Sequence, residues 1–149
     1  MADESEWEHL SGKELDNLVS PSHWSNRLHL FPNIVEHFLT TIASETKSIK
    51  KCIAHELNIN YGEGKFQKLD LYLPPHQTED SPVLISIHGG YWQASSKDDY
   101  GLFAWHPAKQ GAVVAVVNYT IAPMGTLPQM INDVEQAVLY MAKKFPKAR

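Results

Sequence analysis

The five residues His88, Gly89, Gly90, Tyr91 and Trp92 combine types that can stabilise a developing negative charge. They directly follow the apolar run 83–87, which predicts a buried strand. Two glycines weaken a strand end, because glycine loses the most backbone entropy on ordering and packs no side chain. They also let backbone N–H groups approach a ligand closely, as in the oxyanion hole of acyl-transfer enzymes. We therefore expect an oxyanion hole here, with a plain Gly-Gly turn as the alternative.

Two other kinds of site have weaker support in the sequence. The 8 histidines include no His-Glu-x-x-His pattern, and His55 and Glu56 are neighbours on an expected strand, where successive side chains point to opposite faces. The stretch 62–65, Gly-Glu-Gly-Lys, joins a hairpin and opens no helix, so it lacks the helix N-terminus of a phosphate-binding loop. We expect neither a metal site nor a nucleotide site.

The elements around the motif begin with a helix and a hairpin. Apolar residues at helical spacing predict a helix over about 33–46. The alternating stretch 52–61 and the stretch 68–74 predict two strands that pair antiparallel through the glycine-containing turn between them.

The second half of the chain predicts a parallel sheet. The runs 83–87 and 113–117 are continuously apolar, as in strands buried on both faces. A helical connection lies between them, with a capping signal at Ser96 and an interruption at Pro107. An amphipathic helix over about 127–145 follows. The fold class is therefore α/β, and the 88–92 motif falls at the carboxyl end of a parallel strand, where such sheets bind ligands.

Composition limits the partners and the compartment. The net charge is −4 with 13 Lys+Arg, so neither nucleic acid nor an anionic membrane is an expected partner. The single cysteine, Cys52, excludes an intrachain disulfide and fits a reducing compartment, and the acidic start carries no signal peptide. We expect a cytoplasmic protein, with residues 1–32 as an irregular N-terminal arm and 33–149 as the α/β part of the chain.

Four stretches together carry a resemblance to a known family. In order, they are SPSHW (20–24), LDLYLP (69–74), SPVLISIHGGYWQ (81–93) and VVNYTIAPMGTLPQM (116–130). The sequence resembles the kynurenine formamidase (arylformamidase) family of α/β hydrolases. His-Gly-Gly-x-Trp with Asn-Tyr-x-Ile-Ala-Pro at this spacing is typical of the formamidase and hormone-sensitive-lipase-like branch.

The resemblance implies an activity and a set of roles. The reaction is hydrolysis of N-formyl-L-kynurenine to L-kynurenine and formate in tryptophan catabolism, without a cofactor, by a cytoplasmic and also nuclear enzyme that forms a homodimer when complete. The amides of Gly90 and Tyr91 are the implied oxyanion donors, and His88, Gly89 and Trp92 complete the binding motif. The Tyr91 and Trp92 side chains either wall the pocket or only pack, and His88 braces the loop by hydrogen bonds instead of acting as a base. We expect Gly90→Ala to lower turnover and leave the fold intact.

The sequence departs from the family in one respect. Its 149 residues contain no Gly-x-Ser-x-Gly; the last serine is Ser96, and Asp133 has no histidine after His106 as a partner. We therefore expect a truncated α/β-hydrolase fold, in which residues 33–149 form the N-terminal half of the domain and end before the nucleophile elbow. We expect this chain to be inactive alone and to associate with other copies through the strand 83–87. The alternatives are a carboxylesterase of the same branch and a non-catalytic partner of a full-length enzyme.

Overall fold

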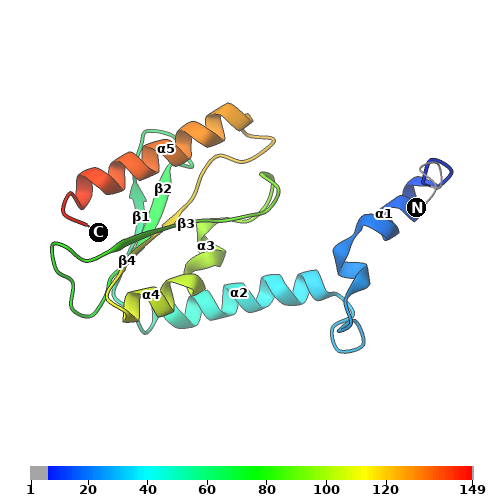
Figure 1. The fold of residues 1–149 in the computed structure, drawn as a ribbon, viewed down its shortest axis with the longest axis horizontal. Coiled ribbons are helices and arrows are strands. Elements are labelled where there is room, and N and C mark those ends of the chain that lie inside the picture. Colours follow the sequence, from blue (N-terminus) through cyan, green and yellow to red (C-terminus); the bar gives the residue numbers. More distant parts are fainter. Residues whose placement is uncertain (1–6, 149) are drawn as a thin grey trace, which may run out of the picture. The chain divides into compact units, whose positions relative to one another are not determined.

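The computed structural model describes residues 7–148, which divide into two compact units, one up to Thr41 and one from Ile42 onward. The first unit contains helix α1 (Gly12–Val19), the 3-10 helix Pro21–Trp24 and the first turns of α2 (Ile34–Lys50) (Figure 1).

Local hydrogen bonds explain the helices of the first unit. The N–H of Ser11 donates to the Glu14 carboxylate at 2.8 Å, and the Glu14 N–H donates back to the Ser11 hydroxyl, which is a capping box. The Trp24 indole N–H donates to the Leu18 carbonyl at 3.0 Å. The expectation of an irregular segment here is therefore wrong, because these bonds hold it in helical turns.

The second unit is built on a four-stranded mixed sheet in the order β1-β2-β4-β3 (Figure 1). Strand β1 (His55–Asn60) pairs antiparallel with β2 (Lys68–Tyr72), which confirms the expected hairpin. Strand β4 (Val113–Val117) pairs antiparallel with β2 and parallel with β3 (Val83–Ile87). The chain thus contains the antiparallel hairpin and the parallel pair that the sequence predicts.

Strand β4 lies at the centre because both of its faces are apolar and covered. Helix α5 (Leu127–Lys144) covers one face, and its Ala137 and Met141 pack on Val113, Ala115 and Val117. The opposite face, with Tyr72, Val114 and Val116, packs on the connection between β3 and β4 through Ala104 and Ala108. All five residues of β4 are buried, as expected for a strand that is apolar on both faces.

The connection from β3 to β4 is helical but interrupted. It consists of α3 (Lys97–Tyr100), the 3-10 helix Gly101–Ala104 and α4 (Trp105–Lys109). As expected, the Ser96 hydroxyl caps α3 by accepting the Asp98 N–H. The interruption lies before Pro107, which falls in the first turn of α4, where a missing N–H costs little.

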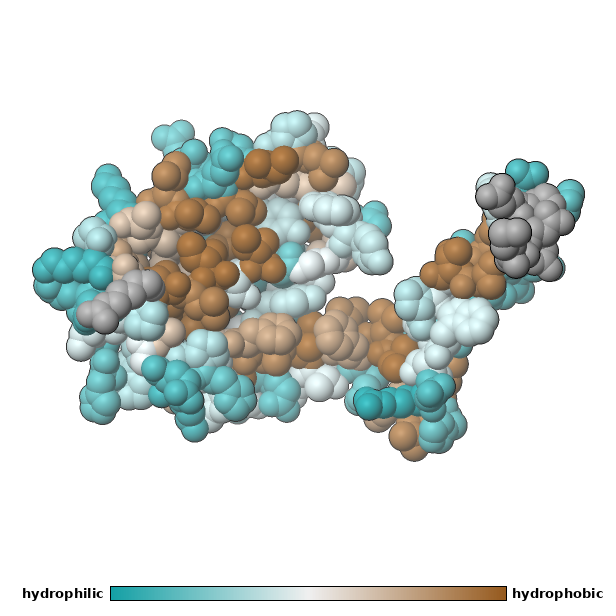
Figure 2. Space-filling view, in the orientation of Figure 1, coloured by the Kyte–Doolittle hydropathy of each residue, from teal (hydrophilic) through white to brown (hydrophobic). Residues whose placement is uncertain are grey.

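Strand β3 is an edge of the sheet, since β4 is its sole neighbour among the strands of the described residues. Its Leu84 and Ile87 side chains are exposed on opposite faces. Figure 2 shows hydrophobic side chains gathered beside α5. The exposed residues of α5 include Leu127, Ile131 and Val138. Within residues 7–148, no helix is both long and apolar enough to span a bilayer.

Candidate functional site

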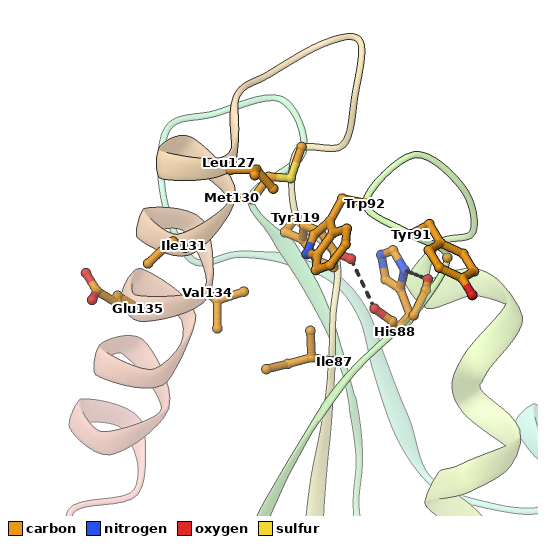
Figure 3. A pocket seen from close by; sticks show the side chains of 12 residues that line it. Ile87, His88, Tyr91, Trp92, Tyr119, Leu127, Met130, Ile131, Val134 and Glu135 are labelled. Carbon is orange, nitrogen blue, oxygen red and sulfur yellow. Dashed lines mark hydrogen bonds between the residues drawn. The ribbon is translucent and has the colours of Figure 1, made fainter. Parts of the chain in front are cut away.

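A pocket of about 810 Å³ opens at the carboxyl ends of β3 and β4 (Figure 3). The loop after β3, from His88 to Trp92, forms one wall, and Tyr119 lies behind it. The first half of α5 forms the other wall with the apolar side chains of Leu127, Met130, Ile131 and Val134. The fold therefore brings all five residues of the sequence motif to the edge of the sheet where α/β folds bind ligands.

The loop turns through three consecutive residues with positive φ: Gly90 at 124°, Tyr91 at 50° and Trp92 at 60°. A Cβ on Gly90 would lie 2.2 Å from the Ala94 carbonyl oxygen, whereas a Cβ on Gly89 would meet nothing within 4 Å. Gly90 is therefore required by the turn itself. We therefore expect Gly90→Ala to strain the loop and lower stability, which the sequence did not indicate, because the added methyl group overlaps backbone that cannot move aside cheaply.

The backbone amides of Gly90 and Tyr91 are unpaired but fixed in direction. Neither donates a hydrogen bond to a protein group in the part of the chain that the structure describes. In a trans peptide the C=O and the next N–H point in opposite directions, so holding one orients the other. The Gly89 carbonyl accepts from His88 Nδ1 at 2.9 Å, and the Gly90 carbonyl accepts from the N–H groups of Gln93 and Ala94, both at 3.0 Å. Both amides are thus preorganised donors.

The His88 side chain belongs to the framework of the loop. It is 2% exposed, and its ring stacks on Tyr119 with centroids 4.5 Å apart. Because the Gly89 oxygen can only accept, Nδ1 carries the proton, and Nε2 is buried without a hydrogen-bond partner. Burial lowers the pKa of His88, against smaller opposing effects of the Gly89 carbonyl and Asp99. A neutral imidazole in this tautomer braces the loop.

The aromatic residues of the motif point outward from the turn. Tyr91 is 83% exposed and Trp92 is 56% exposed, and both line the pocket. The Trp92 carbonyl accepts the Ala122 N–H at 2.7 Å, so the turn is held to the segment that follows β4. Large exposed aromatic surfaces at the mouth of an apolar pocket are suited to contact an aromatic ligand.

Residues 69–147, more than half of the chain, match the family model BD-FAE. The chain belongs to the BD-FAE family. This is an α/β-hydrolase family, and the hairpin, the parallel pair and the crossover helices of the second unit are the corresponding parts of its fold.

Curated relatives of this BD-FAE chain include two fish proteins named kynurenine formamidase. The one from Danio rerio is 35% identical over 141 residues, which are 95% of this chain and 48% of the relative. The one from Salmo salar is 34% identical with the same coverage. An isoprenylcysteine alpha-carbonyl methylesterase of Arabidopsis thaliana is 31% identical over 56% of this chain and 20% of the relative. The chain spans about half the length of the kynurenine formamidases it matches.

Solved structures similar to the BD-FAE chain support the fold. A protein of Silicibacter sp. tm1040 superposes with a TM-score of 0.71 at 25% identity, over 82% of this chain and 46% of that protein. Esterase B of Lactobacillus rhamnosis superposes with a TM-score of 0.55 at 22% identity, over 75% of this chain and 41% of the esterase. The second likeness shows the fold alone.

Asp133, one of the two acidic residues of α5, has a structural role in this BD-FAE chain. Asp133 is buried and accepts from the Thr120 N–H at 2.9 Å, the Thr120 hydroxyl at 2.6 Å and the Gln67 amide at 2.7 Å. These bonds tie α5 to the turn after β1 and to the segment after β4. The sequence singled out Asp133 only as an acid without a histidine; its spacing to Thr120 carried no signal of this contact.

Proposed function

We propose that this chain forms the oxyanion-binding half of a serine hydrolase that converts N-formyl-L-kynurenine to L-kynurenine and formate in tryptophan catabolism. The observation that carries the proposal is the pair of unpaired, anchored amides of Gly90 and Tyr91 beside an apolar pocket. Relatives named kynurenine formamidase, 34–35% identical over 95% of the chain, support the choice of substrate.

The proposed chemistry assigns a role to each part of the loop. When a nucleophile attacks the formyl carbon, the formyl oxygen becomes negatively charged and accepts from the amides of Gly90 and Tyr91. Loss of one such donor costs about 2.7–4 kcal/mol of transition-state stabilisation. Gly89 leaves space for the reacting group, since a Cβ there would meet nothing within 4 Å. The rings of Tyr91 and Trp92 contact the aryl group of the substrate.

The nucleophile is not encoded in the 149 residues, which lack Gly-x-Ser-x-Gly. The hydroxyl of Ser96, the last serine, is occupied at the cap of α3. An oxyanion hole stabilises charge only after attack has begun. The 149-residue chain by itself should therefore show no hydrolase activity.

A carboxylesterase is the second candidate function. It is favoured by the match to methylesterases and by a pocket whose walls on α5 are almost entirely apolar, with Glu135 as the one acidic residue among those that line it. Such a pocket suits an acyl chain as well as an aryl ring.

The test joins this chain to the second half of the Danio rerio relative and compares the chimera with the 149-residue chain. Both are assayed with N-formyl-L-kynurenine and with a short-chain aryl ester, and both are treated with a fluorophosphonate that labels reactive serines. We expect labelling and formamidase turnover in the chimera and neither in the chain alone. A labelled serine in the chain alone would contradict the missing nucleophile. A labelled chimera that hydrolyses only the ester would replace the formamidase with the carboxylesterase.

A further inference from the structure

The segment after β4, residues 118–122, contacts the loop 88–97 at three points. The Tyr119 hydroxyl donates to the His88 carbonyl at 3.1 Å, near the start of the loop. The Ala122 N–H donates to the Trp92 carbonyl at the turn, and the Asn118 side chain accepts the Lys97 N–H at the end. A loop held along its whole length by one neighbouring segment takes its shape from that segment.

Tyr119 makes the contact that leads directly to a proposed oxyanion donor (Figure 3). Its ring lies on the His88 imidazole, with centroids 4.5 Å apart and planes 18° apart. This stacking holds the imidazole so that Nδ1 reaches the Gly89 carbonyl. The Gly89 carbonyl in turn orients the Gly90 N–H through the peptide plane. The hydroxyl of Tyr119 fixes the preceding peptide by its bond to the His88 carbonyl.

Tyr119 is itself held rigidly. It is buried, and the residues on both sides are fastened to other elements. The Asn118 carbonyl accepts from the Tyr61 hydroxyl at 2.7 Å, and the Asn118 side chain donates to the Phe66 carbonyl at 3.2 Å. Thr120 donates twice to Asp133. The support for the loop therefore extends to the β1-β2 hairpin and to α5.

We propose that Tyr119 is a positioning residue for the oxyanion loop: through His88 it fixes the direction of the Gly90 amide without touching the substrate's reacting atoms. This inference rests on the proposed function for its catalytic consequence, but the contact it describes is independent of activity. A tyrosine that only fills the core would tolerate removal of its hydroxyl with no local effect on the loop.

The test removes the hydroxyl and keeps the ring. Tyr119→Phe is compared with Tyr140→Phe, a matched control on α5 whose hydroxyl has no protein partner within residues 7–148. Hydrogen exchange of the 149-residue chain is followed at the amides of Gln93, Ala94 and Ala122, which donate to loop carbonyls. We expect these amides to exchange about three- to tenfold faster in Tyr119→Phe, since one hydrogen bond of ordinary strength is lost. Amides of β2 and β4 should keep their wild-type rates.

Two results would overturn the proposal. The first is that the loop amides exchange at the same rate in Tyr119→Phe and in Tyr140→Phe. The second is that Tyr119→Phe speeds exchange equally at the loop amides and at the amides of β4, which would indicate a general loss of stability.

A kinetic measurement on the chimera separates this inference from the proposed function. If both hold, Tyr119→Phe lowers kcat about tenfold and changes KM by less than about twofold, because the loop acts in the transition state. Tyr119→Leu, which also removes the stacked ring, should lower kcat further. Faster loop exchange with unchanged kcat would support Tyr119 as the residue that positions the loop and would contradict the oxyanion role of that loop. A matched fall in the activity of Tyr140→Phe would contradict the specific role of Tyr119.

Discussion

Gly89 and Gly90 are adjacent in the motif, but the structure requires only one of them to be glycine for conformational reasons. Gly90 has φ 124° and no space for a Cβ, because the Ala94 carbonyl oxygen lies 2.2 Å from where it would be. Gly89 has open space instead. The sequence alone cannot tell which glycine occupies the strained turn position and which one has open space beside it, since both residues are glycine.

The pair gives a direct prediction. Gly90→Ala should lower the free energy of unfolding by about 1–3 kcal/mol, the cost of a strained backbone position, and should speed exchange at Gln93 and Ala94. Gly89→Ala should change stability by less than about 0.5 kcal/mol, as a substitution without new contacts. Urea unfolding with hydrogen exchange measures both effects. Equal stability of the two variants would show that the positive φ at residue 90 imposes no constraint.

His88 gives a prediction about pH. Burial lowers its pKa below the ordinary value of about 6.5, so the unfolded chain takes up a proton on His88 before the folded chain does. The contribution of His88 to the free energy of unfolding is therefore at its maximum above pH 6.5. It is lost as the pH falls toward the folded-state pKa of His88. The groups around the ring are Tyr100, Tyr119 and Asp99, and Asp99 opposes the shift.

The measurement is the free energy of unfolding between pH 8 and pH 5. Wild type should lose stability below pH 6.5, and His88→Asn, which keeps a side-chain N–H donor but cannot titrate, should lose less. If the free energy of unfolding falls equally with pH in wild type and in His88→Asn, groups other than His88 cause the loss of stability.

At the scale of elements, a buried ion pair joins β2 to the start of α3, directly after the loop. Lys97 Nζ lies 2.9 Å from Asp70 Oδ1, and both side chains are at most 4% exposed. The same Asp70 oxygen accepts the Asn58 N–H at 2.8 Å, and Lys50 lies 3.7 Å from the other oxygen. The end of the loop is thereby fixed to the centre of the unit.

Removing one partner of the pair should be costly. Lys97→Met leaves a buried carboxylate with weaker compensation, and we expect a loss of about 3 kcal/mol, at the low end for buried pairs because Lys50 and the Asn58 N–H remain. The double variant Lys97→Met with Asp70→Leu should recover part of this loss. Lys143→Met, at an exposed position of α5, is the control. If Lys97→Met is as stable as Lys143→Met, the ion pair between Lys97 and Asp70 makes no net contribution to the free energy of unfolding.

The elements that the sequence predicted best are those whose signal is local. Runs of apolar residues set the bounds of β3 and β4, and helical periodicity located α5 to within one residue. Helix α1 was missed, although Ser11 and Glu14 form a readable capping box, because the surrounding residues are mostly polar. The need for glycine at residue 101 was not predictable, since it reflects the Tyr72 hydroxyl, 2.1 Å from where a Cβ would lie.

The candidate site was predictable in place but not in detail. The order of strands put the motif at the carboxyl end of β3, and the structure places it there. The bonds from Tyr119 to His88 and from Ala122 to Trp92 join segments about 30 residues apart. Single-sequence patterns carry no signal for such contacts, so the Asn-Tyr-x-Ile-Ala-Pro stretch marked the family without revealing its structural role.

At the scale of the whole molecule, the main feature is an apolar edge. Strand β3 pairs on one side only, among the strands of the described residues, and it exposes Leu84 on one face and Ile87 on the other. It carries no charged residue or proline between residues 83 and 87 that would oppose pairing with another strand. Ile87 of this edge lines the same pocket as Leu127 and Ile131, two exposed apolar residues of α5.

The 149-residue chain should therefore self-associate through β3. An unpaired apolar edge offers free backbone N–H and C=O groups together with hydrophobic side chains, and a lysine on such an edge blocks pairing. We expect wild type to sediment as oligomers, and Leu84→Lys to weaken association by about tenfold or more. Leu139→Lys, a similar change at an exposed position of α5, is the control for added charge and should have a smaller effect. A wild-type chain that sediments as a single monomeric species and unfolds in one sharp transition would contradict edge-driven association, as would equal effects of the two lysines, because charge alone would then account for the change.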